Sequence, residues 1–182
     1  MLKNLLYFIL LIYSLAQGAN AQPRESVKTS TDILMFAAPA AGFISTLALK
    51  DYKGTRALIS SGATSIAATY ILKYAIKKER PDHSDTHSFP SNHTAISFQG
   101  ASFIAKRYGW KYSIPAYLIS GYVGWGRIYS KRHDTWDVIA GAAIGMGSAL
   151  ICTHPLSNKA KLNIAPTVMP NGSIGFYSSI NF

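Results

Sequence analysis

Five apolar segments follow one another along the chain, separated by polar and charged connectors. They cover roughly residues Ile33–Leu49, Ala57–Leu72, Thr94–Ala105, Ser113–Gly126 and Val138–Ile151. Each is longer than an ordinary strand, so the pattern predicts helices. Each is also rich in Ala, Gly, Ser and Thr, which let helices approach one another closely. We therefore expect an all-α protein, a bundle of five or six helices.

The N-terminus has a different pattern. Lys3 gives a basic start, Leu5–Ala16 is apolar, and Ala19-Asn20-Ala21 is a small-residue cleavage site. This order is typical of an export signal, so residues 1–21 are expected to be a signal peptide. The alternative is an uncleaved first membrane span, although Gln17 leaves the apolar stretch short of the roughly 20 residues that a span needs.

Polar residues mark the other boundaries. The stretch from Gln22 to Thr31 is interpreted as a linker, and Asp32 and Asn92 stand where helix N-caps are expected. Near the C-terminus, Asn171-Gly172 lies between two strand-like runs and predicts a β-hairpin. The expected organisation is a helical domain over residues 22–162 and a hairpin tail over residues 163–182.

Composition narrows the partners. Hydrophobic residues make up 48% of the 182 residues, and 18 basic against 8 acidic residues give a net charge of +10. This excess attracts anions. The basic residues are scattered between apolar segments rather than gathered in a stripe, so nucleic acid is not an expected partner. A membrane and a phosphorylated substrate fit better. The single cysteine, Cys152, excludes an intrachain disulfide and a thiolate metal site.

Three polar clusters stand at the ends of the apolar segments. They read Lys73-x6-Arg80-Pro81, Pro90-Ser91-Asn92-His93 and Gly126-Arg127-x5-His133-x3-Asp137. Short connections make consecutive helices antiparallel neighbours, so all three clusters fall at the same end of an up-and-down bundle. Cations, two histidines and a carboxylate are therefore expected to meet at one mouth.

The cations of these clusters suit a phosphate ester. Phosphoryl transfer needs positioned positive charge and backbone donors around the phosphoryl oxygens. Arg80 and Arg127 can bind phosphate through two parallel hydrogen bonds, and Lys73 acts as a point charge. Ser91 and Asn92 open a helix, where free N–H groups favour an anion.

The histidines suit covalent catalysis. One of His93 and His133 can attack phosphorus while the other protonates the departing oxygen. Asp137 follows His133 at i+4 spacing and can hold its imidazole in the attacking tautomer. This chemistry requires neither a metal nor a cofactor. Two further histidines, His83 and His87, are interpreted as solvated loop residues rather than as metal ligands.

At these residues the chain resembles the phosphatidic acid phosphatase type 2 superfamily, whose pattern is K-x6-R-P, then P-S-G-H, then S-R-x5-H-x3-D. All three motifs occur in order between Lys73 and Asp137. Two positions depart from the pattern. Asn92 replaces a glycine, and Asn tolerates left-handed backbone better than most residues. Gly126 replaces a serine and so lacks a hydroxyl that would bind phosphate.

The resemblance implies a role for each motif residue. His133 would be the nucleophile, Asp137 its orienting partner, and His93 the general acid that later serves as the base activating water. The residues implied to bind phosphate are Lys73, Arg80, Ser91, Asn92 and Arg127.

The expected substrate is a lipid-linked phosphate, hydrolysed through a phosphohistidine. A compact exported chain with a short loop between its first two motifs resembles lipid A phosphatases, so lipid A phosphate ranks first, followed by undecaprenyl pyrophosphate or phosphatidylglycerol phosphate. The alternatives are a soluble periplasmic nonspecific acid phosphatase, a vanadium haloperoxidase and an inactive lipid-binding protein.

The basic connectors Lys50–Arg56 and Lys106–Lys111 would face the cytoplasm. This orientation places the site on the periplasmic face of a bacterial inner membrane. The sequence does not indicate an oligomeric state.

Overall fold

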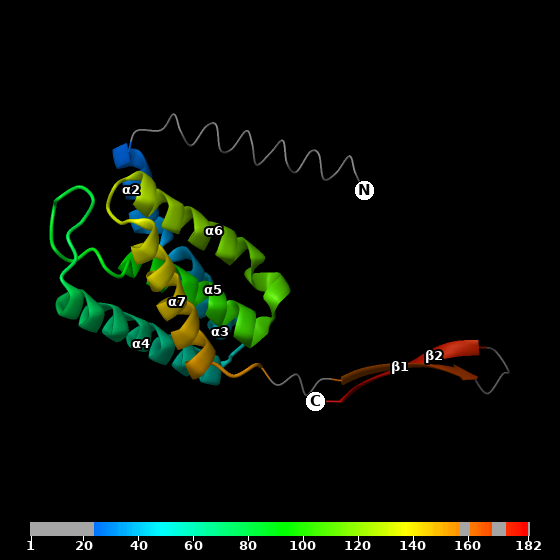
Figure 1. The fold of residues 1–182 in the computed structure, drawn as a ribbon. Helices are drawn as coiled ribbons and strands as arrows, with labels where there is room; N and C mark the ends of the chain where they lie inside the picture. The colour runs from blue at the N-terminus through cyan, green and yellow to red at the C-terminus, as the bar shows by residue number, and fades with distance from the viewer. Residues whose placement is uncertain (1–23, 157–160, 169–173, 182) are drawn as a thin grey trace, which may run out of the picture.

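The computed structural model describes residues 24–156, 161–168 and 174–181, so the expected signal at residues 1–21 and the hairpin turn at Asn171-Gly172 lie outside the described residues. The described part contains six helices followed by two strands (Figure 1). The elements are α2 (Arg24–Leu34), α3 (Ala37–Ala48), α4 (Tyr52–Ile76), α5 (Asn92–Tyr108), α6 (Trp110–Tyr129), α7 (Thr135–Cys152), β1 (Lys161–Val168) and β2 (Ile174–Asn181).

Helix α5 is the centre of the bundle and contacts every other described helix. Small residues make this position possible. A Cβ atom on Gly100 of α5 would meet the backbone nitrogen of Pro39 at 2.3 Å, and one on Gly145 of α7 would meet the carbonyl oxygen of Ala95 at 2.2 Å. The close helix approach that the small residues predict is therefore confirmed, together with the all-α bundle.

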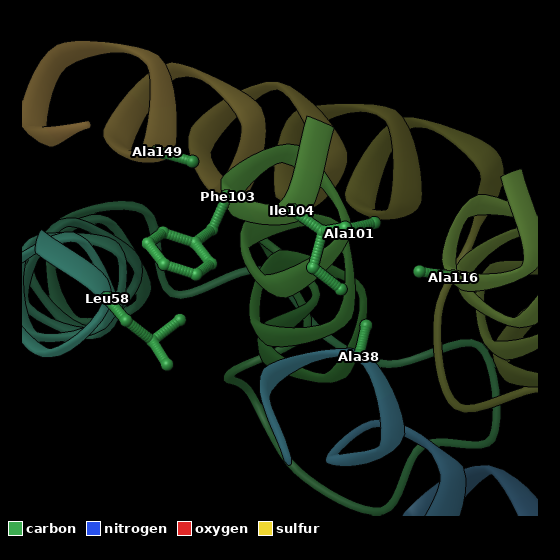
Figure 2. Close-up of a cluster of buried hydrophobic side chains, with 7 residues drawn as sticks. All are labelled: Ala38, Leu58, Ala101, Phe103, Ile104, Ala116 and Ala149. Atoms are coloured by element: carbon green, nitrogen blue, oxygen red, sulfur yellow. The ribbon is translucent and has the colours of Figure 1, made fainter. Parts of the chain in front are cut away.

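The hydrophobic core lies along α5, toward the end of that helix far from Asn92. Phe103 is its largest side chain, and its ring points toward α4, where Leu58 lies (Figure 2). The other members are four alanines and one isoleucine, in keeping with closely packed helices: Ala38, Ala101, Ile104, Ala116 and Ala149.

Much of the outer surface of the bundle is apolar. Ile71 and Leu118 are each 69% exposed, and Ile151 is 79% exposed. Within the described residues, two helical segments, Arg24–Ala48 and Thr135–Cys152, are long and apolar enough to cross a membrane. Large apolar surfaces of this kind fit a lipid environment better than water.

The helices expose two different ends. The first, called here the mouth, is formed by α2, the loop of residues 77–91 and the loop of residues 130–134; the second, called the opposite end, is formed by residues 49–51, Gly109 and residues 153–156 (Figure 1). All three sequence clusters lie at the mouth, as the counting of helices predicts.

The linker expected over Gln22–Thr31 is wrong from Arg24 onward, because these residues form α2. Only Val27 and Thr31 of that helix are buried, at i, i+4 spacing. Most of its other residues are polar, which is why the sequence resembles a linker. The expected N-caps are also wrong. Asp32 lies in the last turn of α2, and the cap of α5 is Ser91 rather than Asn92.

The C-terminal hairpin is present. Strand β1 pairs antiparallel with β2, so that Lys161 stands opposite Asn181 and Val168 opposite Ile174. The first strand, β1, begins at Lys161, slightly before the expected boundary at residue 163.

Candidate active site

A cavity of about 240 Å³ opens at the mouth. Its wall comes from α4, the loop of residues 77–91, the first turn of α5 and the loop before α7, and no carboxylate of the described chain lines it. The lining residues are Tyr70, Lys73, Tyr74, Arg80, His87, Asn92, His93 and His133. Both motif histidines therefore face one space, together with cations from the first motif.

His133 and Asp137 meet at the start of α7. Asp134 is the N-cap, and its side chain accepts a hydrogen bond from the Asp137 backbone N–H at 3.0 Å. The Asp137 carboxylate accepts one from the Asp134 N–H at 3.1 Å in return, a reciprocal capping box. This cap holds the Asp137 Oδ2 3.5 Å from the His133 Nδ1. The predicted pair forms, although His133 precedes the helix instead of lying on it.

Two side chains outside the motifs complete the carboxylate's environment. The Ser88 hydroxyl donates to the Asp137 Oδ2 and lies 3.5 Å from the His133 Nδ1. The Lys78 ammonium donates to the Asp137 Oδ1 at 2.9 Å. Both carboxylate oxygens are thereby bound, and Asp137 is fully buried. Sequence reasoning missed both partners, because Ser88 belongs to no motif and Lys78 sits in a basic run that resembles a solvated turn.

His133 is a neutral imidazole near pH 7. Burial lowers the pKa of His133 to about 4, and the nearby charges of Arg80 and Lys73 act in the same direction against the opposing effect of Asp137. With Asp137 accepting from Nδ1–H, the other nitrogen carries the lone pair. That Nε2 lies 3.4 Å from the Arg80 Nη1.

The cations of the first motif are held from behind the cavity. The Lys73 ammonium donates to the carbonyl oxygens of His87 at 2.8 Å and Pro90 at 2.7 Å. Arg80 donates through Nε to Asp85 at 2.7 Å and through Nη1 to the Arg132 carbonyl at 3.2 Å. Within the described residues, the buried Lys73 ammonium binds only the neutral carbonyl oxygens of His87 and Pro90. Its positive charge is therefore available to an anion.

The second motif builds the N-terminus of α5. Ser91 is buried and its oxygen accepts from the Thr94 hydroxyl at 3.0 Å, so it faces the helix and does not line the cavity. Asn92 lines the cavity and its Oδ1 accepts from the Thr69 hydroxyl at 3.0 Å. Asn92 is helical, and the described non-glycine residues with positive φ do not include it. The left-handed backbone that would explain Asn92 in place of glycine is therefore not adopted.

His93 and Arg127 share one partner that the motifs do not contain. The Asp32 Oδ1 lies 2.8 Å from the His93 Nε2 and 2.6 Å from the Arg127 Nη1. The same Arg127 nitrogen lies 3.4 Å from the Thr31 hydroxyl. Arg127 is buried, and its Nε has no hydrogen-bond partner among the described residues. Asp32 comes from α2, far from the motifs in sequence, and no pattern identifies it.

The second departure from the family pattern has a packing cause. A Cβ atom on Gly126 would meet the Thr31 Cγ2 at 2.5 Å and the Val27 Cγ1 at 3.1 Å. Helix α2 thus occupies the space that a serine side chain would need.

The remaining loop residues divide into two groups. His87, expected to be solvated, forms part of the cavity wall, and its ring packs edge-on against Tyr74 with centroids 5.2 Å apart. His83 is exposed and lies 2.7 Å from Glu79. Arg132 binds Asp82 at 2.9 Å and so ties the two loops of the mouth together.

Comparison with known proteins places this arrangement in context. A lipid A 4'-phosphatase of Helicobacter pylori is 27% identical over 164 residues, covering 84% of this chain and 82% of that protein. A lipid A 1-phosphatase of Porphyromonas gingivalis is 38% identical over 77 residues, covering 41% of this chain. The match spans only 17% of the length of the Porphyromonas protein.

Two solved structures share the fold. LpxE of Aquifex aeolicus has a TM-score of 0.60 at 20% identity, covering 73% of this chain and 88% of that one. A transmembrane phosphatidylglycerolphosphate phosphatase of Bacillus subtilis has a TM-score of 0.55 at 23% identity, covering 83% and 92%. The family profile described as PAP2 superfamily matches residues 54–161, more than half of the chain and all three motifs. The chain belongs to the PAP2 superfamily.

Proposed function

We propose that the protein is a membrane phosphatase that hydrolyses a lipid-linked phosphate through a phosphohistidine on His133. One observation carries the proposal: His93 and His133 line a single cavity with Lys73 and Arg80, and Asp137 stands behind the neutral His133 ring. A nucleophile, an acid and cations around one anion-sized space are what phosphoryl transfer needs.

In the first step the His133 Nε2 attacks phosphorus. The N–P bond forms as the P–O bond to the lipid breaks, and His93 gives its proton to the departing oxygen. Asp137 holds the Nδ1–H and stabilises the positive charge that develops on the ring. Lys73 and Arg80 bind the phosphoryl oxygens, where negative charge is spread in the transition state.

In the second step His93, now neutral, accepts a proton from water as that water attacks the phosphohistidine. The N–P bond breaks, inorganic phosphate leaves, and His93 regains its proton. Arg127 and Asn92 complete the anion site, the latter at the N-terminus of α5, where backbone N–H groups favour a phosphate. Ser91 acts by capping that helix. The cations of the chain supply the charge that a metal would otherwise bring.

A lipid substrate fits the surface around the cavity. Tyr70 and Tyr74 line the cavity and are 46% and 62% exposed, and Ile71 beside them is 69% exposed. A headgroup phosphate in the cavity would leave acyl chains along this apolar face of α4. Lipid A phosphate ranks first because two similar proteins are named lipid A phosphatases. Undecaprenyl pyrophosphate and phosphatidylglycerol phosphate follow.

The mouth faces the periplasm in the bacterial inner membrane. Exposed Lys50, Lys53 and Arg56 lie at the opposite end with Lys106 and Lys111. Cytoplasmic loops are rich in such residues, which supports a cytoplasmic opposite end once the basic residues of the mouth are assigned to phosphate binding. An exported N-terminal segment at residues 1–21, cleaved or spanning, is compatible with this orientation.

The substrate is tested with detergent-purified protein, EDTA and a panel of lipid A, undecaprenyl pyrophosphate, phosphatidylglycerol phosphate and soluble esters. We expect phosphate release from lipid A to be fastest and insensitive to EDTA. Loss of activity in EDTA would contradict the metal-independent mechanism. Release from soluble esters alone, by protein extracted without detergent, would favour the periplasmic nonspecific acid phosphatase.

The intermediate is tested by rapid quenching with substrate carrying labelled phosphate. Label that is stable in base and lost in acid should appear on the protein, at His133 by peptide mapping. His133→Ala should take up no label, whereas His93→Ala should hold its label longer because water is no longer activated. Label on His93 instead would reverse the two roles.

A further inference from the structure

A single carboxylate oxygen bridges the proposed acid and a proposed phosphate-binding cation. The Asp32 Oδ1 lies 2.8 Å from the His93 Nε2 and 2.6 Å from the Arg127 Nη1. These partners come from α2, α5 and α6, so the contact joins three helices at the mouth. The three motifs do not include Asp32.

We infer that Asp32 is a positioning residue, which holds His93 in place as a proton donor and fixes the direction of the Arg127 guanidinium. This inference rests on the proposed function, because it presupposes that His93 is the general acid. The inference assigns a role in the reaction to a side chain outside the three motifs.

Asp32 stands beside the anion site and does not fill it. Neither Asp32 nor Arg127 is among the residues that line the cavity, so the pair stands next to that space, beside His93. It engages only the Nη1 of Arg127, and the buried Nε of that guanidinium has no partner among the described residues. A buried N–H without an acceptor is costly, and a phosphoryl oxygen would satisfy it. Arg127 can therefore bind Asp32 with one edge and phosphate with the other.

The packing of α2 shows that this contact is built into the fold. Thr31 is fully buried against α6, where the absent side chain of Gly126 leaves it room. The adjacent Asp32 is thereby brought to Arg127, and the Thr31 hydroxyl lies 3.4 Å from the same guanidinium nitrogen. Where the family pattern has a serine hydroxyl, this chain brings the side chains of a neighbouring helix.

Charge explains why His93 needs this partner. The charged and titratable groups that act on it are Arg127 from α6, His133 from the loop before α7, and Asp32 from α2. Burial and the two basic neighbours lower the pKa of His93 to about 4, and only the Asp32 carboxylate opposes them. Without Asp32 the pKa of the ring would lie lower still, so Asp32 and the negative charge of a bound phosphate are the groups that favour the proton an acid must carry.

The test compares substrates with poor and good leaving groups. Asp32→Asn keeps the size of the side chain and removes its charge, with Asp32→Ala as a second variant. For short-chain phosphatidic acid, whose leaving oxygen needs a proton, kcat/KM should fall about 10- to 100-fold. For p-nitrophenyl phosphate, whose leaving group departs unprotonated, it should fall by a factor of about 3 or less. The alkaline limb of kcat/KM should also move to lower pH.

Matched variants keep the outcomes apart. Glu25→Gln, an exposed acid of the same helix paired with Lys28, should leave the ratio between the substrates unchanged. His93→Gln should reproduce the leaving-group effect. Suppose that His93→Gln does so, but the Asp32 variants lower kcat/KM equally for both substrates, or raise it because the anion site has become free. The inference is then wrong and the proposed function stands. If His93→Gln shows no leaving-group effect, the acid role fails and the inference fails with it.

Discussion

The two ends of the bundle both bury charge, but they use it differently. At the opposite end, Arg107 donates to Asp51 through Nε at 2.7 Å and also through Nη2, and its Nη1 donates to the His154 carbonyl at 2.8 Å. Asp51 also accepts from the Tyr108 hydroxyl at 3.1 Å and from the Gly54 N–H at 2.9 Å. Each guanidinium nitrogen has an acceptor, and the charges cancel.

At the mouth, cations turn toward a cavity that no described carboxylate lines. Lys73 is held by carbonyl oxygens, and the Nε of Arg127 has no partner within the described residues. Buried charge alone therefore does not mark a functional site, since ion pairs that serve the fold are buried as well. What distinguishes the mouth is a buried lysine, Lys73, that contacts carbonyl oxygens rather than a carboxylate. The arginines beside it do have carboxylate partners, Asp85 and Asp32, but these carboxylates lie outside the cavity wall.

The largest expected effect tests this distinction at His133, the proposed nucleophile. His133→Ala should lower kcat about 10⁴-fold or more, because the covalent route is lost. The melting temperature in detergent should fall only modestly, because the Asp137 carboxylate keeps its bonds from Ser88, Lys78 and the Asp134 N–H. Phosphate release and thermal unfolding measure the two quantities. A similar loss of activity per folded molecule in an Arg107 variant would erase the contrast between the ends.

The converse change is Asp51→Asn at the opposite end. Arg107 would keep its charge without a counter-ion, so the free energy of unfolding should fall by about 3–5 kcal/mol. The kcat of the folded fraction should stay the same, because Asp51 is far from the cavity. Denaturant titration in detergent, with activity normalised to folded protein, checks both. A tenfold lower kcat at unchanged stability would mean that the opposite end takes part in catalysis.

Gly126→Ser tests how closely α2 packs against α6 at the mouth. This change restores the serine of the family pattern, yet it should destabilise the protein by about 1–3 kcal/mol through overpacking against Thr31 and lower activity by moving α2. Adding Thr31→Ser removes the clashing methyl group and should recover most of both losses. Activity above that of the natural protein in the single variant would show that the missing hydroxyl, not the packing, limits the reaction.

A smaller effect is expected at Ser88. Ser88→Ala removes a hydrogen bond to the buried Asp137 carboxylate, and bonds to charged groups contribute about 1.5–3 kcal/mol. We expect kcat to fall about tenfold with KM nearly constant, since Ser88 does not line the cavity. Ser113→Ala, whose hydroxyl donates only to a backbone carbonyl at the start of α6, is the matched control. Equal effects in both variants would refute a specific role for Ser88.

The mildest test is acidification. In the proposed mechanism His133 attacks as the neutral ring, and its pKa is lowered to about 4, so the acidic limb of kcat/KM should appear only as the pH falls toward 4. At the opposite end, the hydrogen bond from Arg107 lowers the pKa of Asp51 below 3.8. A depressed carboxyl pKa gives stability that is lost only as the pH falls through the folded value. Activity should therefore disappear before the fold does.

The sequence predicts this protein well wherever a pattern repeats or a motif is dense. Four of the five apolar segments lie within single helices, and the first, Ile33–Leu49, crosses the break between α2 and α3. Five motif residues line the same cavity: Lys73, Arg80, Asn92, His93 and His133. Most helices extend beyond the apolar segments that predicted them, because an apolar run marks only the middle of a helix. The first and last turns are polar and resemble loops in the sequence.

What the sequence could not predict depends on single contacts. Helix α2 buries only Val27 and Thr31, and its sequence is so polar that it resembles a linker. Ser88, Lys78 and Asp32 act on motif residues across long sequence separations, and each is a residue type common on surfaces. Their roles follow only from distances in the folded chain.

The packing of α2 against α6 affects which residues an expressed catalytic domain must include. A shortened gene starting at residue 35 would encode every motif and the whole span matched by the family profile, yet it would lack the two side chains that reach Arg127 from the preceding helix. Expression boundaries drawn from motif positions would thus yield a protein with intact signatures and a misaligned proton donor.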